Sequence, residues 1–399
     1  MINFDFNQHC CGCTSCANSC PTGAIRMLPD EDGFLMPSID KDKCIDCGAC
    51  DKRCPHLNTQ VDIQRFSLDD FKGMPAYLYY SNKPERINSA SGGFVYDAFM
   101  HFVENGGYAV GCIWNEELKA CHVVCHNKEG VIKTQSSKYV QSDLGDCFRK
   151  IRDLLRQGEK IAFCGTPCQT AGVKQYLGKL SESEQFLSIC LICHGVASPK
   201  VWQFYKGCLE RKYDMRMVNA NMRDKHNKGY SLSYARYAFA KSVSGRSLET
   251  SVSWPTYLSD PYIYLFTDDL YLRNSCYSCK YKSVHTGADI IVGDFYASTQ
   301  GAGNEGCSCL VALTDKGNQT IHSLDGTIKP SSIEEVGGVN GMIYHSVAMN
   351  PKRNQFFADL NNNPDMGMDL FKKYLPFRFY VKNALGRLGL FKAVKKILG

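Results

Sequence analysis

The first sixty residues contain two copies of one cysteine spacing. Each copy reads C-x2-C-x2-C-x3-C-P, at residues 10–21 and 44–55. In such a run three thiolates bind one 4Fe–4S cluster, and the fourth cysteine reaches a second cluster. The spacing therefore predicts two ligand sets, one of Cys10, Cys13, Cys16 and Cys54 and the other of Cys44, Cys47, Cys50 and Cys20.

Zinc and disulfides explain this pattern less well. Structural zinc usually takes two separated C-x2-C pairs, and disulfide frameworks are typical of short secreted chains. The proline after each run stops the local helix and turns the chain away. Cys11 lies outside the pattern, and we expect it to be a bystander thiol. The unit, residues 1–57, should therefore carry single electrons.

Length and composition indicate a soluble globular protein of two or three domains. The chain has 399 residues, of which 44% are hydrophobic and 22% charged, as in ordinary globular proteins. We find no apolar run of the ~20 residues that span a membrane and no signal-peptide pattern. The 22 cysteines then indicate reduced thiols and a cytoplasmic location.

The net charge of +6 treats the thiols as neutral. Each 4Fe–4S cluster with its four thiolates contributes roughly −2, so three clusters would cancel the positive charge. The charge is therefore no argument for nucleic-acid binding.

The remainder of the chain alternates helical and strand patterns. Residues 58–73 are polar and resemble a linker, and residues 74–350 predict an α/β (α+β) domain with a mixed sheet. Expected helices cover 94–105, capped by Ser91, and 143–157, and two more begin at Pro199 and Pro261. Expected strands cover 108–114, 160–164, 185–193, 230–240, 288–295 and 307–313.

The carboxyl-terminal segment 351–399 is a basic helical tail, in which residues 371–399 carry lysines and arginines between apolar side chains and no acidic residue. A terminal helix packed on the core with a basic outer face explains this pattern. The alternative is a weak contact with an anionic membrane surface.

Cysteines of the main domain gather in three places, GTPCQ at 165–169, CLICHG at 190–195 and CYSCKY at 276–281. Each lies at the end of an apolar run, and sites in α/β sheets form where such runs end and loops converge. Four of these thiols would suffice for a third 4Fe–4S cluster. On the pattern alone, buried structural cysteines or an all-thiolate zinc site explain them equally well.

Several motifs, taken in order, resemble one family. They are SASGGF at 89–94, SKYVQS at 137–142, FCGTPCQTAG at 163–172, ICHGVASP at 192–199, RDK at 223–225, LRNSCYSC at 272–279 and GDF at 293–295. With the double cysteine run, they resemble the family of coenzyme F420 hydrogenase/dehydrogenase beta subunits, with a fused bacterial two-cluster ferredoxin domain. The likeness covers residues 1–310 well and fades beyond them.

The resemblance implies FAD and a third 4Fe–4S cluster near it. Its cluster ligands would be Cys168, Cys193, Cys276 and Cys279, with Cys164 and Cys190 as neighbours that could take the place of a ligand. Glycines before a helix suit a diphosphate because they permit close approach of backbone N–H groups. The implied flavin contacts are Ser91, Gly92, Gly93, Lys138, Thr166, Pro167, Gly293 and Asp294, and the implied catalytic residues are His194, as a proton donor, and Lys138.

The segment GAGNEG at 301–306 matches G-x-G-x-x-G but precedes an expected strand, so it does not predict a dinucleotide site. We expect an iron–sulfur flavoprotein oxidoreductase that takes electrons from a ferredoxin or another low-potential donor and reduces a small organic acceptor. The alternatives are an electron-transfer beta subunit of a larger hydrogenase or dehydrogenase, which would have a partner subunit and no substrate of its own, and a scaffold with structural clusters.

Overall fold

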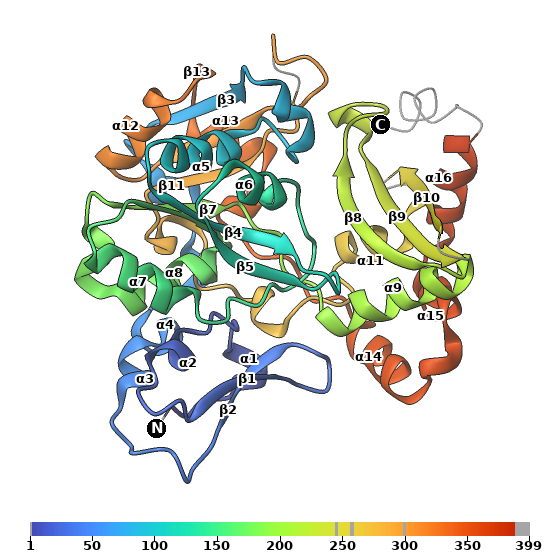
Figure 1. Ribbon diagram of the computed structural model, residues 1–399, viewed down its shortest axis with the longest axis horizontal. Helices are drawn as coiled ribbons and strands as arrows, with labels where there is room; N and C mark the ends of the chain where they lie inside the picture. The colour runs from blue at the N-terminus through green and yellow to red at the C-terminus, as the bar shows by residue number, and fades with distance from the viewer. Residues whose placement is uncertain (1, 244–245, 256–258, 298–300, 388–399) are drawn as a thin grey trace.

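The computed structural model describes residues 2–243, 246–255, 259–297 and 301–387. A small cysteine-rich unit, which we call the ferredoxin-type unit, lies at the bottom of Figure 1. Its antiparallel hairpin joins β1 (Ile25–Pro29) to β2 (Leu35–Ile39). Its helices are α1 (Phe6–His9), α2 (Ser15–Ser19), α3 (Ala49–Arg53) and α4 (Pro55–Asn58).

The two cysteine runs share one backbone path. Gly12 and Thr14 in the first run have φ of 68° and 62°, and Asp46 and Gly48 at the equivalent positions of the second have 50° and 68°. These left-handed turns bend the chain between successive cysteines, which lets three thiols of one run face the same volume.

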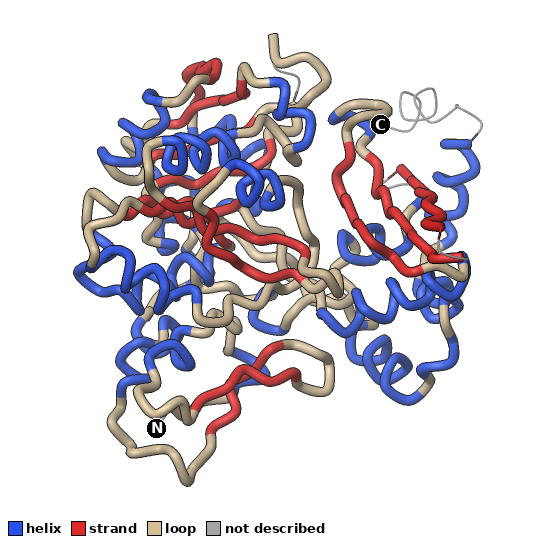
Figure 2. The backbone as a smooth tube through the Cα atoms, viewed as in Figure 1, coloured by secondary structure: helices blue, strands red, loops and turns tan. Residues whose placement is uncertain are grey.

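An eight-stranded mixed sheet forms the centre of the main body (Figure 2). Its order is β13-β3-β12-β11-β7-β6-β4-β5, and the four strands from β11 to β4 are mutually parallel. The bounds are β3 (Ala76–Ser81), β4 (Tyr108–Trp114), β5 (Ala120–Cys125), β6 (Ile161–Gly165), β7 (Phe186–Leu191), β11 (Ile290–Asp294), β12 (Ser308–Ala312) and β13 (Gly326–Ser331).

Helices cover both faces of this sheet. Alternate strand residues pack on one side against α5 (Phe94–Glu104), α6 (Lys128–Thr134) and α12 (Asp315–Ser323). The opposite residues pack against α7 (Cys147–Arg156), α8 (Pro167–Leu177) and α13 (Ile333–Val339). The predicted α/β class with a mixed sheet is confirmed.

A second, three-stranded antiparallel sheet lies beside the first at the right of Figure 1. It consists of β8 (Arg216–Asp224), β9 (Tyr234–Val243) and β10 (Arg246–Pro255). Its apolar face packs around the buried Trp202 with α9 (Pro199–Tyr213), α11 (Pro261–Thr267), α14 (Arg353–Asn362) and α15 (Met368–Tyr374). The sequence patterns did not separate this sheet from the first.

The expected elements recur with shifted ends. The helix expected from residue 143 begins at Cys147, and the strand expected at 230–240 begins at Tyr234. Ser91 does not cap α5: Gly93 occupies that position, and the Ser91 hydroxyl donates to the Cys307 carbonyl at 2.6 Å. The segment 58–73 is not a free linker, because Phe71 is fully buried in the main core.

The carboxyl-terminal segment is helical as far as it is described, with α15 followed by α16 (Phe377–Arg387). Phe379 is buried and Phe377 is exposed. Residues 388–399 of the predicted tail lie outside the described residues. In the described chain no helix is long and apolar enough to cross a membrane.

The ferredoxin-type unit is fixed to α7 and α8. Arg149 donates to the carbonyls of Ala17 at 2.8 Å and Cys20 at 3.1 Å, and Arg53 donates to the Gln175 carbonyl at 2.9 Å. Gly172 of α8 lies so close that an added Cβ would be 2.7 Å from Cβ of Cys13. The cysteine runs therefore lie against the main body.

Candidate cluster and flavin sites

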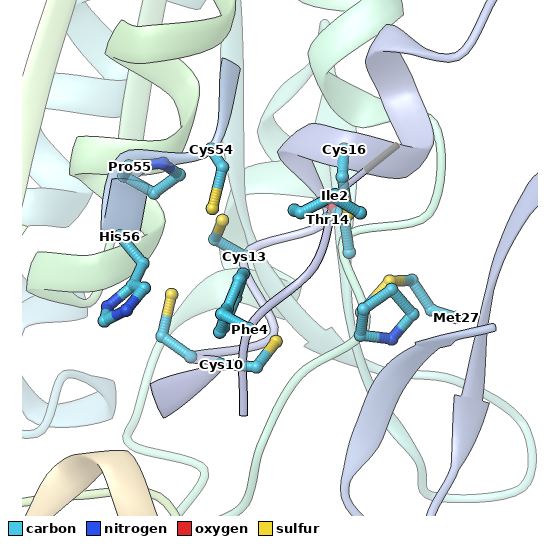
Figure 3. Close-up of a pocket in the computed structure, with 12 residues that line it drawn as sticks. Ile2, Phe4, Cys10, Cys13, Thr14, Cys16, Met27, Cys54, Pro55 and His56 are labelled. Carbon is cyan, nitrogen blue, oxygen red and sulfur yellow. The ribbon is translucent and has the colours of Figure 1, made fainter. Parts of the chain in front are cut away.

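The two predicted amino-terminal ligand sets line two separate pockets. The first pocket contains Cys10, Cys13, Cys16 and Cys54 and has an empty volume of about 340 Å³, open solvent included. In Figure 3 the side chains of Cys13 and Cys54 point toward each other, with His56 beside them. The second pocket contains Cys20, Cys44, Cys47 and Cys50, and its empty volume is about 350 Å³. The structure thus groups each fourth cysteine with the opposite run, as a two-cluster fold requires.

The two pockets differ in their access to solvent. Cys47 of the second pocket is exposed, and the neighbouring Ile45 has 65% of its surface exposed. In the first pocket Cys13, Cys16 and Cys54 are buried. The second pocket is therefore the outer one and the first is the inner one.

A third pocket brings together all four of the remaining predicted ligands. Cys168, Cys193, Cys276 and Cys279 line an empty volume of about 420 Å³, open solvent included. Cys168 follows the end of β6 and Cys193 follows the end of β7, while the other two come from the loop after α11. Carboxyl ends of parallel strands are where α/β sheets form sites.

This third pocket suits an anionic cluster. The buried cations Arg273 and Lys282 line it, and Cys168 lies in the first turn of α8, where the helix dipole favours negative charge. Burial raises the pKa of Cys279 to about 11, against the opposing effect of the Lys282 charge. Iron that displaces these thiol protons would remove that penalty. One buried nitrogen of Arg273 has no hydrogen-bond partner in the described chain, as expected of a donor facing a missing acceptor.

Cys164 and Cys190 lie apart from this pocket. Cys164 packs in the core on one face of the sheet, and Cys190 packs in the core on the other. The wall of the third pocket includes neither thiol. The geometry therefore favours Cys168 and Cys193 as the ligands from their respective pairs.

In the described residues no three His, Cys, Asp or Glu side chains converge as they would on a single metal ion. A four-iron cubane instead takes one thiolate at each corner, so its ligands surround a volume.

His194 also lines the third pocket. Its Nε2 lies 2.6 Å from a carboxylate oxygen of Asp269, and its ring packs on Phe266 at 5.3 Å. The imidazole therefore lies between a carboxylate and an aromatic ring. Thr166 and Pro167 line the same pocket, and the Thr166 hydroxyl lies 3.3 Å from Sγ of Cys168.

The other implied flavin contacts lie around the loop 89–94. A Cβ on Gly92 would be 2.3 Å from the Tyr79 carbonyl, so packing against β3 already requires this glycine. Gly93 has φ of 92° at the amino end of α5, where no side chain caps the helix. A Cβ on Gly293 would similarly meet Ile192 at 2.6 Å. The backbone packing therefore explains why glycine occupies these positions, whether or not a ligand binds there.

Two buried cations near the loop 89–94 provide stronger support for a flavin site than the glycines do. Arg86 and Lys225 are 6% and 1% exposed, and their described hydrogen bonds all go to backbone carbonyls, including that of Ser91. Nε of Arg86 is buried without a partner among the described residues. Burial and the Arg86 charge lower the pKa of Lys225 to about 7. Arg86 therefore has a free donor for an anionic group such as a diphosphate, and Lys225, whose three donors bond to carbonyls, adds positive charge beside it.

Lys138 has a structural position. Its ammonium donates to backbone carbonyls at the end of α6, at 2.8 Å for Gln135 and 3.2 Å for Thr134. Burial lowers its pKa to about 8. The lysine thus caps a helix, and no described contact directs it to the third pocket.

Polar and aromatic contacts connect Asp294, one of the implied flavin contacts, with the third pocket. Arg223 binds Asp294 at 3.1 Å and the Tyr139 hydroxyl at 3.2 Å. Tyr139 stacks on Phe266 at 4.8 Å, and Phe266 contacts His194. The implied flavin residues and the four cysteines thus belong to one region.

Sequence reasoning missed the charged residues of this region. Arg273 and Lys225 occur in the LRNSCYSC and RDK motifs, so the motifs contained them, but no spacing rule assigns them a role. Arg86 and Lys282 had no sequence signal.

Comparisons with known proteins agree with this arrangement. Residues 158–335 match the family model for the C terminus of the coenzyme F420 hydrogenase/dehydrogenase beta subunit, and residues 9–58 match that of a 4Fe–4S dicluster domain. The chain joins a 4Fe–4S dicluster domain to the carboxyl-terminal domain of this family of beta subunits. The latter domain contains all four cysteines of the third pocket.

Three individual proteins are similar to this chain. One subunit of the F(420)H(2) dehydrogenase of Methanosarcina mazei is 22% identical over 302 residues, which cover 72% of this chain and 76% of the relative. An uncharacterized polyferredoxin-like protein of Methanocaldococcus jannaschii is 43% identical over 62 residues, 14% of this chain and 37% of that protein. A chain of the F420-reducing [NiFe] hydrogenase complex from Methanosarcina barkeri aligns at a TM-score of 0.41 with 15% identity, over 75% of this chain and 90% of its own. The two family matches and the Methanosarcina mazei relative identify this chain as an iron–sulfur protein related to oxidoreductase subunits.

Proposed function

We propose that this protein is an iron–sulfur flavoprotein oxidoreductase that passes electrons from a ferredoxin-type donor to a small organic acceptor. The main support for this proposal is the set of three cysteine-lined pockets, of which the third adjoins the loops that would hold FAD. When bound, 4Fe–4S clusters relay single electrons and a flavin couples them into pairs.

The chain's own residues have separate tasks in this proposal. The outer cysteine set, with the exposed Cys47, faces the donor. Three of the four inner cysteines are buried and all four of the third set are partly buried, so both sets are more shielded from water than Cys47. All cysteines are free thiols, which fits a reducing cytoplasm. We assign residues 1–57 to the two-cluster domain, 74–350 to the flavin and third-cluster domain, and 351–399 to the carboxyl-terminal segment.

On the flavin side, the loop 89–94 with Arg86 and Lys225 would bind the diphosphate. Asp294 would lie near the ribose or ring, held by Arg223 at 3.1 Å. His194, whose Nε2 lies 2.6 Å from the Asp269 carboxylate, would supply the proton for the two-electron step.

Anaerobic purification with quantified iron, sulfide and flavin tests this function. We expect about twelve irons and one FAD per chain, from three four-iron clusters. About eight irons would refute the third cluster, and absence of flavin after reconstitution would refute the flavoprotein. Cys279→Ser should lower iron by about four atoms and leave the amino-terminal pair intact, whereas Cys208→Ala, a buried thiol on α9, should lose none.

A second candidate is an electron-transfer subunit without a substrate of its own. It is favoured by the Methanosarcina mazei relative, which is named as one subunit of a dehydrogenase. Purification at native expression distinguishes the two: a stoichiometric partner favours the subunit, and an active chain on its own favours the enzyme.

A further inference from the structure

Cys11 lies between two of the three pockets. It lines the inner pocket together with Cys10, Cys13, Cys16 and Cys54, and it also lines the third pocket. No other residue of the described chain appears in both walls. Among the described residues of the ferredoxin-type unit, Cys11 is the one that lines the third pocket.

The side chain of Cys11 lies beside an expected ligand on each side. It shares the wall of the inner pocket with Cys13 and the wall of the third pocket with Cys168. The backbone holds it there, because the adjacent Gly12 has φ of +68° and a Cβ on it would be 2.3 Å from Nε2 of Gln141. The position of Cys11 is thus fixed by the fold.

Two further donors converge on the same place. Arg273 is 1% exposed, and its Nε donates to the Cys10 carbonyl at 2.6 Å, yet one of its terminal nitrogens is buried without a partner in the described residues. The Tyr281 hydroxyl is likewise buried and without a hydrogen-bond partner there, and Tyr281 lines the third pocket together with Cys11 and Cys168. Unsatisfied buried donors are rare and costly unless an acceptor is missing.

We propose that Cys11, flanked by Arg273 and Tyr281, is the bridge between the inner and third clusters. It rests on the proposed function, since it requires both clusters. With both clusters bound, the three residues would donate hydrogen bonds to cluster sulfurs and would raise both reduction potentials, which depend on such bonds. One electron would pass from the reduced inner cluster to the oxidised third cluster; no bond would be made or broken, and Cys11 would remain a thiol. These are positioning residues that act through the cluster ligands.

Redox titration of the full chain, followed by electron paramagnetic resonance, tests the bridge. In Cys11→Ala we expect full iron content, lower potentials for the inner and third clusters, and an unchanged outer cluster. Tyr281→Phe, which removes only the hydroxyl, should lower the same two potentials, and Cys11→Ser, which keeps a donor, should shift them less than Cys11→Ala. The matched control Cys208→Ala should shift none.

Each outcome decides the proposal. Full iron with unchanged potentials in Cys11→Ala and Tyr281→Phe would overturn it. Loss of about four irons in Cys11→Ala would also overturn it, because Cys11 would then be a ligand. If Cys11→Ala does not fold, Tyr281→Phe decides alone. About eight irons in the unaltered protein would instead refute the proposed function, so the two failures are distinguishable.

Discussion

Arg273→Met should loosen the ferredoxin-type unit from the main body. The guanidinium donates to two carbonyls of that unit, Cys10 at 2.6 Å and Leu35 at 3.1 Å. Hydrogen bonds to charged groups contribute about 1.5–3 kcal/mol each. Methionine keeps much of the apolar stem but leaves both carbonyls without this donor. Since the two bonds are coupled, we take about 3 kcal/mol as the loss in the free energy of docking.

Hydrogen exchange at one amide measures this loss. The Leu35 amide donates to Oε1 of Gln141 across the interface at 3.0 Å, so it exchanges when the unit separates. A loss of about 3 kcal/mol corresponds to roughly 100-fold faster exchange. The neighbouring Phe34 amide bonds within the hairpin, to Asp30 at 2.8 Å, and should change far less.

The exposed Arg211 provides a matched substitution, Arg211→Met, which should leave both amides unchanged. Less than about threefold acceleration at Leu35 in Arg273→Met, with iron content intact, would refute the reasoning, because it would correspond to under about 0.7 kcal/mol.

Four further predictions concern Lys225, the cysteine turns and the second sheet. Burial lowers the pKa of Lys225 to about 7, so the affinity for flavin should weaken as the pH rises above 7, by up to tenfold per pH unit. In a fluorescence titration, Lys225→Met should abolish this pH dependence. A pH-independent affinity in the unaltered protein would contradict the prediction. The same depressed pKa means that unfolding takes up a proton between about pH 7 and 10.4, so this lysine's contribution to the free energy of unfolding should rise with pH over that window. Gly12→Ala should reduce iron in the inner pocket, since its Cβ would meet Gln141 at 2.3 Å; the same iron content as in Gly23→Ala, where no atom lies within 4 Å, would count against this. Trp202→Ala should cost about 3–5 kcal/mol in chemical denaturation, because Trp202 is 1% exposed within the aromatic cluster; a loss under 1 kcal/mol would disprove that packing role.

The sequence predicted elements whose signals are local. Pro199 and Pro261 each follow a side chain that caps the helix, Ser198 and Asp260, and both helices begin as expected. The cysteine runs defined their two pockets because the ligand spacing is set by cluster geometry and a short backbone path.

Features that depend on distant contacts were not predictable in this way. Ser91 precedes α5 by a capping-like spacing, yet its hydroxyl bonds to Cys307, more than two hundred positions away. Phe71 looked like one apolar residue in a polar segment and is fully buried. The separation of β8–β10 from the main sheet arises from packing around Trp202, which no period in the sequence shows.

The exposure of Cys47 has a consequence for damage by air. Oxygen and other small oxidants would reach the outer cysteine set before the buried sulfurs of Cys13, Cys16 and Cys54. Oxidative damage would therefore begin at the outer cysteine set and reach the inner set later. A chain that had lost iron only from the outer cysteine set would keep the iron of the inner set, and adding iron and sulfide to the outer set would restore it.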